Sequence, residues 1–289
     1  MPKNAKKKPP YETVIDTRVT RLYRYQPFVE QHLESTLNGA LRFSNPQAFN
    51  DPWDCKPWFY VPDDHAERVR LIQWFDRVAR KSDPHPDEEL RARQIDELQR
   101  NPEELRSIMA QTSEAIYADL GRRFRLCCFT TKPACPLMWA HYGDRHRGIC
   151  LEFDAWREDL RSAIKVQYRE SYPLFLLDDG NDISPFYTKS ADWRYEDEYR
   201  LISEEEGTAF HKETLKTCDG FYQLPRNALM SVIIGALAPA EVRARIAGMV
   251  ARIAPHLIVR QATCLSDRYR LAIEPPIPPN DDFGDSTLV

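Results

Sequence analysis

The chain has 289 residues, 42% of them apolar and 29% charged, and its 40 basic and 44 acidic side chains leave a formal charge of −4. With a mean hydropathy of −0.58, this composition excludes an intrinsically disordered chain and a membrane-spanning one. The negative charge also argues against a nucleic-acid binder held by overall charge, although a local basic patch stays open.

The N-terminal residues 1–18 are predicted to form a flexible basic tail, because four lysines precede two prolines and no apolar core of a signal peptide follows. No window reaches the roughly 18 apolar residues of a membrane span. The odd number of cysteines, seven, argues for reduced thiols rather than a disulfide framework. We therefore expect a cytoplasmic protein without a membrane partner, and the sequence does not predict its oligomeric state.

The first folded segment is predicted to be a strand over 19–25, a helix over 28–37 that Gly39 ends, and a strand over 40–44. Residues 45–54, NPQAFNDPWD, combine two prolines with two asparagines and two aspartates, which is the composition of a turn. We expect a loop that contains aromatic side chains there.

Residues 64–121 change in character, because apolar side chains recur at helical spacing throughout this block. Asn101, Pro102 and Glu104 fit the cap, the first-turn proline and the capping glutamate of its last helix. The block is predicted to be a helical insertion.

The second half is predicted to be rich in strands, over 124–130, 148–153, 164–169, 198–203 and 230–235. A late helix is predicted over 242–253, followed by closing strands over 257–263 and 269–273. The proline-rich residues 275–289 are expected to be a disordered tail. The sequence thus predicts one α+β domain over 19–274, interrupted by the insertion over 64–121.

Polar and aromatic side chains crowd residues 135–153, CPLMWAHYGDRHRGICLEF, just before a predicted strand. The candidates for a site in this segment are Trp139, His141, Tyr142, Arg145 and His146. The alternative interpretation is that the tryptophan belongs to the core and that the charged residues form a solvated helix end.

A second candidate segment is 189–202, KSADWRYEDEYRLI, in which Glu196 and Glu198 are two residues apart. In a strand, both carboxylates would point to the same face. Lys189, Trp193 and Arg200 are candidates for supporting roles around this pair. A plain edge strand with exposed charges is the alternative.

Four segments carry a resemblance to a known family: 22–25 (LYRY), 43–54 (FSNPQAFNDPWD), 137–153 (LMWAHYGDRHRGICLEF) and 189–200 (KSADWRYEDEYR). In this order they resemble the bacterial domain-of-unknown-function 2971 family over about residues 22–235. The family name implies no activity by itself.

The order of these segments also resembles the ADP-ribosyltransferase fold, a split β-sheet around NAD. The resemblance implies that Glu198 is the catalytic acid and that Glu196 orients or deprotonates the acceptor. It implies that Arg24 contacts pyrophosphate, that Ser44 occupies the second-strand position, and that the cofactor-binding set is Arg24, Ser44, Asn50, Trp139, His141 and Tyr142. Trp139 or Tyr142 would stack on the nicotinamide ring, and His141 would orient a ribose hydroxyl. NAD would be the substrate, the acceptor a protein, a nucleic acid or a small molecule, and the role one in toxicity or phage defence.

Two other interpretations stay open. Asp192, Glu196, Glu198 and Lys189 could surround a divalent cation in a phosphodiesterase or nuclease, since carboxylates are hard-ion ligands. The aromatic and arginine side chains could instead form a non-catalytic recognition surface. No metal is expected, because the cysteines and histidines of 127–146 lack the spacing of a zinc site.

Overall fold

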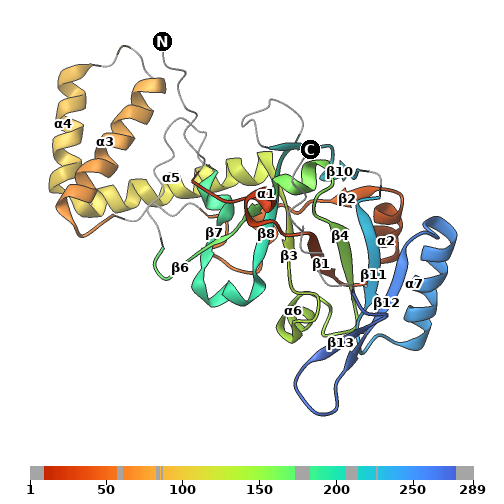
Figure 1. Cartoon of the computed structure of the whole chain (residues 1–289). Helices are drawn as coiled ribbons and strands as arrows, with labels where there is room; N and C mark the ends of the chain where they lie inside the picture. The colour runs from red at the N-terminus through yellow and green to blue at the C-terminus, as the bar shows by residue number, and fades with distance from the viewer. Residues whose placement is uncertain are drawn as a thin grey trace, which may run out of the picture.

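The computed structural model describes residues 10–56, 61–82, 85, 87–172, 183–205, 214–225 and 227–277. It confirms the α+β class, with a mostly antiparallel central sheet (Figure 1). Within the described residues, the sheet has the strand order β13-β12-β11-β4-β1-β3-β8-β5, and β9 also pairs with β8. These strands are β1 (Arg21–Gln26), β3 (Phe124–Thr130), β4 (Ile149–Asp154), β5 (Ile164–Lys165), β8 (Glu198–Glu205), β9 (Leu215–Thr217), β11 (Leu229–Ile234), β12 (Ile258–Cys264) and β13 (Leu271–Glu274).

Two smaller strand pairs flank this sheet. β2 (Ala40–Arg42) pairs antiparallel with β10 (Phe221–Gln223), and β6 (Gln167–Arg169) pairs parallel with β7 (Thr188–Ser190). The helices packed around the strands are α1 (Val14–Thr17), α2 (Glu30–Leu37), α6 (Pro136–His141) and α7 (Ala240–Ile253). The 3-10 helices lie at Pro46–Ala48, Glu158–Ser162, Ser184–Tyr187 and Ala191–Glu196. Gly39, with a φ of 91°, follows α2 in a conformation that other residues rarely adopt, which explains why the helix ends there.

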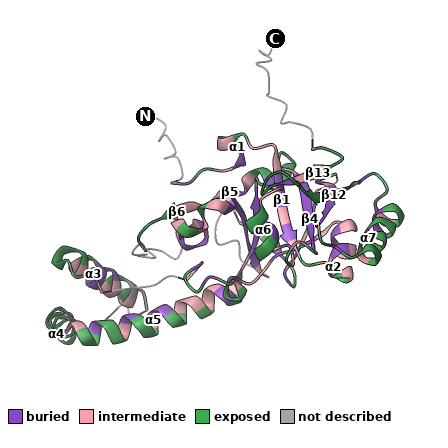
Figure 2. Cartoon of the chain, turned by 90° about the horizontal axis from the view of Figure 1, so that it is seen from below, coloured by how far each residue is buried: buried purple, intermediate pink, exposed green. Residues whose placement is uncertain are grey.

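The alternation of side chains along β1 separates two apolar layers, one on each face of the sheet. Leu22 packs with Leu151 and Phe153 in the main core, which also holds Leu33 of α2 and Ile246 of α7. On the other face, Tyr23 and Tyr25 pack with Met138 and Trp139 of α6. In Figure 2, buried residues are concentrated in the strands of this sheet. Each fully buried apolar side chain contributes about 1.5–3 kcal/mol, so the sheet is the stable platform of the molecule.

The central sheet is continuous, but β1 and β3 pair over only a small part of their length. β1 pairs with β4 at six register positions, but in the described residues it pairs with β3 only through Tyr23 and Thr130. Farther along β3, Leu126 exchanges backbone hydrogen bonds with Ser44 instead. The two strands therefore separate beyond Tyr23, which opens the sheet on this side.

The predicted helical block forms α3 (His65–Ser82), α4 (Glu88–Arg100) and α5 (Pro102–Arg123), which project from the sheet as an arm (Figure 1). Asn101 caps α5, because its side chain accepts a hydrogen bond from the backbone N–H of Glu104 at 3.3 Å. The arm has a small apolar core of its own, made of Leu71, Ile72, Trp74, Leu98, Leu105 and Met109.

The expected N-terminal tail is too long. Val14 is fully buried, Tyr11 is buried in a second apolar cluster, and Thr13 forms a β-bridge with Ile164. Residues 10–18 are therefore part of the fold, whereas residues 1–9 of the predicted tail lie outside the described residues. At the other end, Arg260 holds the carbonyl oxygens of Pro275 and Pro276.

Residues 278–289 of the predicted C-terminal tail also lie outside the described part. In the part of the chain that is described, no helix combines the length and the apolar character needed to cross a bilayer.

Candidate functional site

A cavity of about 360 Å³ lies where β1 and β3 separate. Its volume lies within the range for small-molecule ligand pockets, at the lower end. Side chains from all four resembling segments line it together: Tyr23, Arg24, Tyr25, Ser44, Ala48, Phe49, Asn50, Asp54, Cys128, Phe129, Thr130, Met138, His141, Tyr142, Lys189, Glu196 and Glu198.

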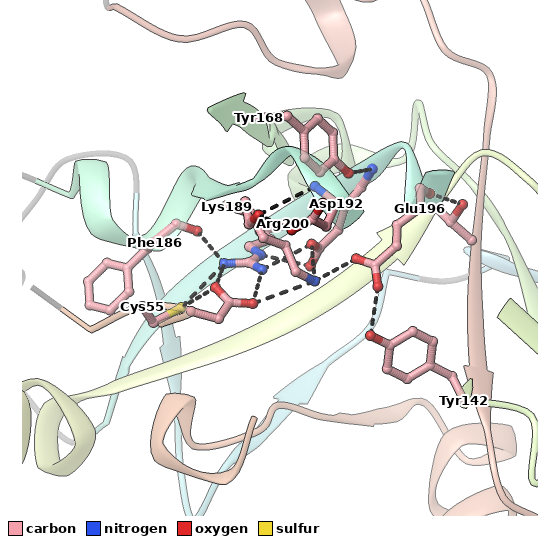
Figure 3. A network of polar contacts seen from close by, with 12 residues as sticks. Cys55, Tyr142, Tyr168, Phe186, Lys189, Asp192, Glu196 and Arg200 are labelled. Carbon is pink, nitrogen blue, oxygen red and sulfur yellow. Dashed lines mark hydrogen bonds and ion pairs between the residues drawn. The ribbon is translucent and has the colours of Figure 1, made fainter. Parts of the chain in front are cut away.

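One wall of this cavity is a buried ion network centred on Lys189 (Figure 3). The Lys189 Nζ lies 2.5 Å from Glu196 Oε2, 3.2 Å from Glu198 Oε2 and 3.5 Å from Asp54 Oδ2. All four side chains are at most 5% exposed. The ammonium group therefore joins three carboxylates that would otherwise repel one another.

Arg200 completes the network from the side away from the cavity. Its side chain is fully buried and binds Asp54 through two hydrogen bonds of 2.8 and 2.6 Å and Glu198 through two of 2.7 and 2.9 Å. It also donates to the carbonyl oxygen of Phe186 and to Cys55 Sγ. Such bidentate pairs fix the orientation of both carboxylates.

The local backbone explains how Glu196 and Glu198 converge. The expectation that both lie in one strand is wrong: Glu196 ends the 3-10 helix Ala191–Glu196, and Glu198 begins β8. Asp197 between them has a φ of 46°, and Thr131 Oγ1 donates to its carboxylate. This left-handed residue turns the chain so that both carboxylates still reach Lys189.

The pKa values of the two carboxylates are shifted in opposite directions. Burial, together with the charge of Glu198, raises the pKa of Glu196 to about 6, because Lys189 only partly offsets these effects. Burial also disfavours the charge of Glu198, but Arg200 and Lys189 outweigh it and hold the pKa of Glu198 well below its usual value. Neighbouring carboxyl groups with separated pKa values are an arrangement suited to acid–base chemistry.

The oxygens of Glu196 are held on two sides. Burial raises the pKa of Tyr142, so its hydroxyl stays protonated and donates to Glu196 Oε1 at 2.6 Å. Lys189 donates to Glu196 Oε2, and its pKa is raised despite burial because Glu198 and Asp54 stabilise its charge. With every group ionised, three carboxylates and two cations leave one negative charge at the cavity wall.

Several predicted site residues do line the cavity. Arg24 lies on β1, Ser44 follows β2, and Asn50 lies in the turn-rich loop. His141 and Tyr142 reach the cavity from the end of α6. The structure thus brings together side chains that are up to 174 residues apart, between Arg24 and Glu198.

Other predicted residues lie elsewhere. The expectation that Trp139 stacks on a ligand is wrong, because its ring is fully buried against Tyr25 and its Nε1 donates to the carbonyl oxygen of Pro133. His146 stacks on the far side of Trp139, in a loop where Arg145 and His146 both have positive φ, and Arg145 is exposed. Arg145 and His146 therefore do not line the cavity.

Trp193 borders a second cavity of about 490 Å³, which adjoins the first at Asn50, Asp54 and Lys189. The Lys189 Nζ lies 4.9 Å from the centre of the Trp193 ring. Trp53, which is 58% exposed, lines the same second cavity. A second molecule can therefore approach the ion network from this side.

Sequence reasoning missed part of the site. The turn-like composition of residues 45–54 gives no indication that Asp54 is 3% exposed and holds both Lys189 and Arg200. The sequence also assigns no role in the site to Tyr23, Tyr25, Phe49, Cys128 or Thr130. The spacing of Glu198 and Arg200, two apart in a strand, did carry a signal for their pairing on one face.

The geometry argues against the divalent-cation interpretation. Lys189 Nζ already occupies the position between Asp54, Glu196 and Glu198 that a cation would take. Asp192, the fourth expected ligand, is exposed and accepts a hydrogen bond from Ser190 Oγ. Among the described residues, no group of three or more His, Cys, Asp or Glu side chains has the arrangement of a metal site.

No protein-family model, curated protein or solved structure matches the chain.

Proposed function

We propose that the chain is an NAD-dependent ADP-ribosyltransferase whose active site is the cavity between β1 and β3. The observation that carries this proposal is the pair Glu196 and Glu198, two buried carboxylates with opposite pKa shifts in the wall of that cavity. The short pairing of β1 with β3, which leaves the two strands apart beyond Tyr23, supports an ADP-ribosyltransferase-like fold.

The reaction would break the bond between C1′ of the ribose and the nicotinamide nitrogen. Nicotinamide leaves with the bonding electron pair, and the ribose passes through an oxocarbenium-like state. The negative charge of the ion network, with Glu198 nearest to full ionisation, stabilises this positive charge. The acceptor then forms the new bond to C1′, and its proton passes to Glu196, whose raised pKa suits a general base near neutral pH.

The remaining cavity residues would position NAD. Arg24 offers a planar guanidinium to the phosphates, and Phe49 and Tyr142 offer rings for the nicotinamide in place of the buried Trp139. Ser44, Asn50 and His141 would bind hydroxyl or amide groups. The acceptor would enter through the second cavity, which meets the first at Lys189.

The test is nicotinamide release from NAD by the purified protein, compared with Glu196→Gln and Glu152→Gln. Glu152 is a matched control, because it is equally buried and ion-paired but lies outside both cavity walls. We expect release by the wild-type chain, a fall of about 100-fold in Glu196→Gln, and an unchanged rate per folded molecule in Glu152→Gln. Release that survives in Glu196→Gln, or that is absent from the wild type with every acceptor class, contradicts the proposal.

A further inference from the structure

Three basic side chains from three elements meet beside the cavity. Arg24 of β1 donates through Nη1 to the carbonyl oxygen of Arg42 in β2 and to Cys127 Sγ at 3.1 Å. Arg42 Nη1 lies 3.0 Å from His32 Nε2 of α2. Arg24 also lines the cavity, and Arg42 precedes the cavity residue Ser44 by two positions. We call Arg24, Arg42 and His32 the basic cluster.

The basic cluster differs from the buried cations Lys189 and Arg200, which carboxylates balance. In the part of the chain that the structure describes, no acidic side chain lies within ion-pair distance of its three members. The charges that act on His32 are those of Arg42 from β2 and Arg24 from β1; Glu30, on the same helix as His32, is paired with Arg245 instead. The Arg24 guanidinium at the carbonyl oxygen of Arg42 and the Arg42 guanidinium at His32 both place positive charge around His32, which makes this region one of positive potential.

The contact between Arg42 and His32 also fixes the protonation of the imidazole. A guanidinium group has only donors, so a hydrogen bond from Arg42 requires His32 Nε2 to accept, and the imidazole must be neutral. Burial and the two arginine charges act in the same direction, because they lower the pKa of His32. A protonated His32 would lose this hydrogen bond and repel Arg42.

We propose that the basic cluster is a phosphate-binding site at the edge of the cavity, and that His32 takes up a proton when the phosphate binds. An anion between Arg24 and Arg42 supplies the missing counter-charge and accepts hydrogen bonds from both guanidinium groups. Arg42 then turns from His32 to the anion, and the imidazole becomes a third donor when it is protonated. In the described residues Arg24 and Arg42 use only Nη1 in hydrogen bonds, so their other donors are open to the ligand.

This site would bind a phosphate group whichever reaction the cavity carries, so the inference does not rest on the transferase proposal. Binding is expected to strengthen as the pH falls through the His32 titration, because the protonated imidazole adds a donor and a charge. A substrate with a phosphate at this position would therefore be held more tightly in mildly acidic solution.

The test uses sulfate as the probe, since this dianion does not titrate near neutral pH. The imidazole signals of the full chain are followed by NMR from pH 5 to 8, with and without sulfate, at an ionic strength kept constant with chloride. His32→Asn assigns the His32 signal. We expect sulfate to raise the His32 midpoint by about half a pH unit or more, which by linkage corresponds to about threefold tighter binding to the protonated form. The exposed His256 serves as an internal control with no shift.

Arg42→Ala supplies the second arm. It should abolish the effect of sulfate on His32, whereas Arg252→Ala, which removes an exposed arginine of α7, should leave it unchanged. An equal shift of all histidine signals, or no shift of His32 in the wild type, overturns the inference. If sulfate acts as expected but NAD is not consumed, the phosphate site stands and the transferase proposal fails; NAD consumption without a sulfate effect has the opposite meaning.

Discussion

Glu152 and the Glu196–Glu198 pair are both buried carboxylates held by two cations, but the pair lines the 360 Å³ cavity and Glu152 lines neither of the two described cavities. Arg21, Arg260 and Ser231 all bind Glu152, and one positive charge remains in this set. Around Lys189 and Arg200, one negative charge remains instead, and it faces the cavity. Buried charge alone therefore does not distinguish the two networks, whereas the sign of the remaining charge and its position at the cavity wall do.

The largest expected effect concerns stability. Arg200→Gln leaves Asp54 and Glu198 without their main partner, so the free energy of unfolding should fall by about 3–5 kcal/mol. Arg260→Gln in the other network should cost less, because Arg21 still neutralises Glu152. Urea denaturation measures both. Equal losses for the two variants would contradict the difference between the networks.

The second effect concerns activity without loss of stability. Glu196→Gln should lower nicotinamide release by about 100-fold, while the fold is as stable as the wild type or more so at pH 7, since an ionised Glu196 is unfavourable in its buried position. Glu198→Gln is a less specific test, because it also breaks the bidentate pair with Arg200. A strong loss of stability in Glu196→Gln would mean that this carboxylate is structural.

The third effect is the pH dependence of stability. Because the folded-state pKa of Glu196 is raised from 4.5 to about 6, the folded chain holds this proton more tightly, and the stabilisation is present below pH 4.5 and lost as the pH rises through 6. The loss amounts to about 2 kcal/mol. Glu198 has the opposite sign: its stabilisation is lost only as the pH falls below about 4.5. The free energy of unfolding of wild type and Glu196→Gln is measured from pH 4.5 to 7.5. The wild type should lose stability relative to Glu196→Gln as the pH rises, whereas a constant difference between the two proteins would contradict the shift.

The smallest effect comes from one hydroxyl. Tyr142→Phe removes the hydrogen bond to Glu196, which should cost about 1 kcal/mol and about fivefold in activity, and should move the activity midpoint to higher pH. Tyr195→Phe is the control, because the Tyr195 hydroxyl is buried with no hydrogen-bond partner in the described residues. If both variants behave alike, the Tyr142 hydroxyl has no role at the carboxylate.

The sequence predicts those helices and strands whose formation depends on interactions between residues close together in the chain. The strand over Phe124–Thr130 and the capped start of α5 at Asn101 follow from apolar spacing and capping side chains. The expected strand over 164–169 is instead two short strands, since the backbone N–H of Val166 between them binds the carbonyl oxygen of Glu198. That contact depends on the tertiary fold.

The site was predictable only in part for the same reason. The pairing of Asp54 with Arg200 joins residues 146 positions apart, and no local pattern indicates it. Trp139 shows the converse error: a tryptophan among polar residues suggested a ligand contact, but its neighbours on β1 bury it completely. The positive φ of Asp197 likewise decides where Glu196 points; aspartate tolerates this conformation better than most residues, but that preference alone does not place the turn at this position.

The most direct measurement is calorimetric titration of the purified chain with NAD, repeated on Arg24→Ala and with magnesium alone. The cavity at β1 and β3 predicts one NAD bound per chain and binding at least about tenfold weaker in Arg24→Ala, as expected for a lost charge-assisted contact to phosphate. Absence of NAD binding beside clear magnesium binding would contradict the account and favour phosphodiester chemistry.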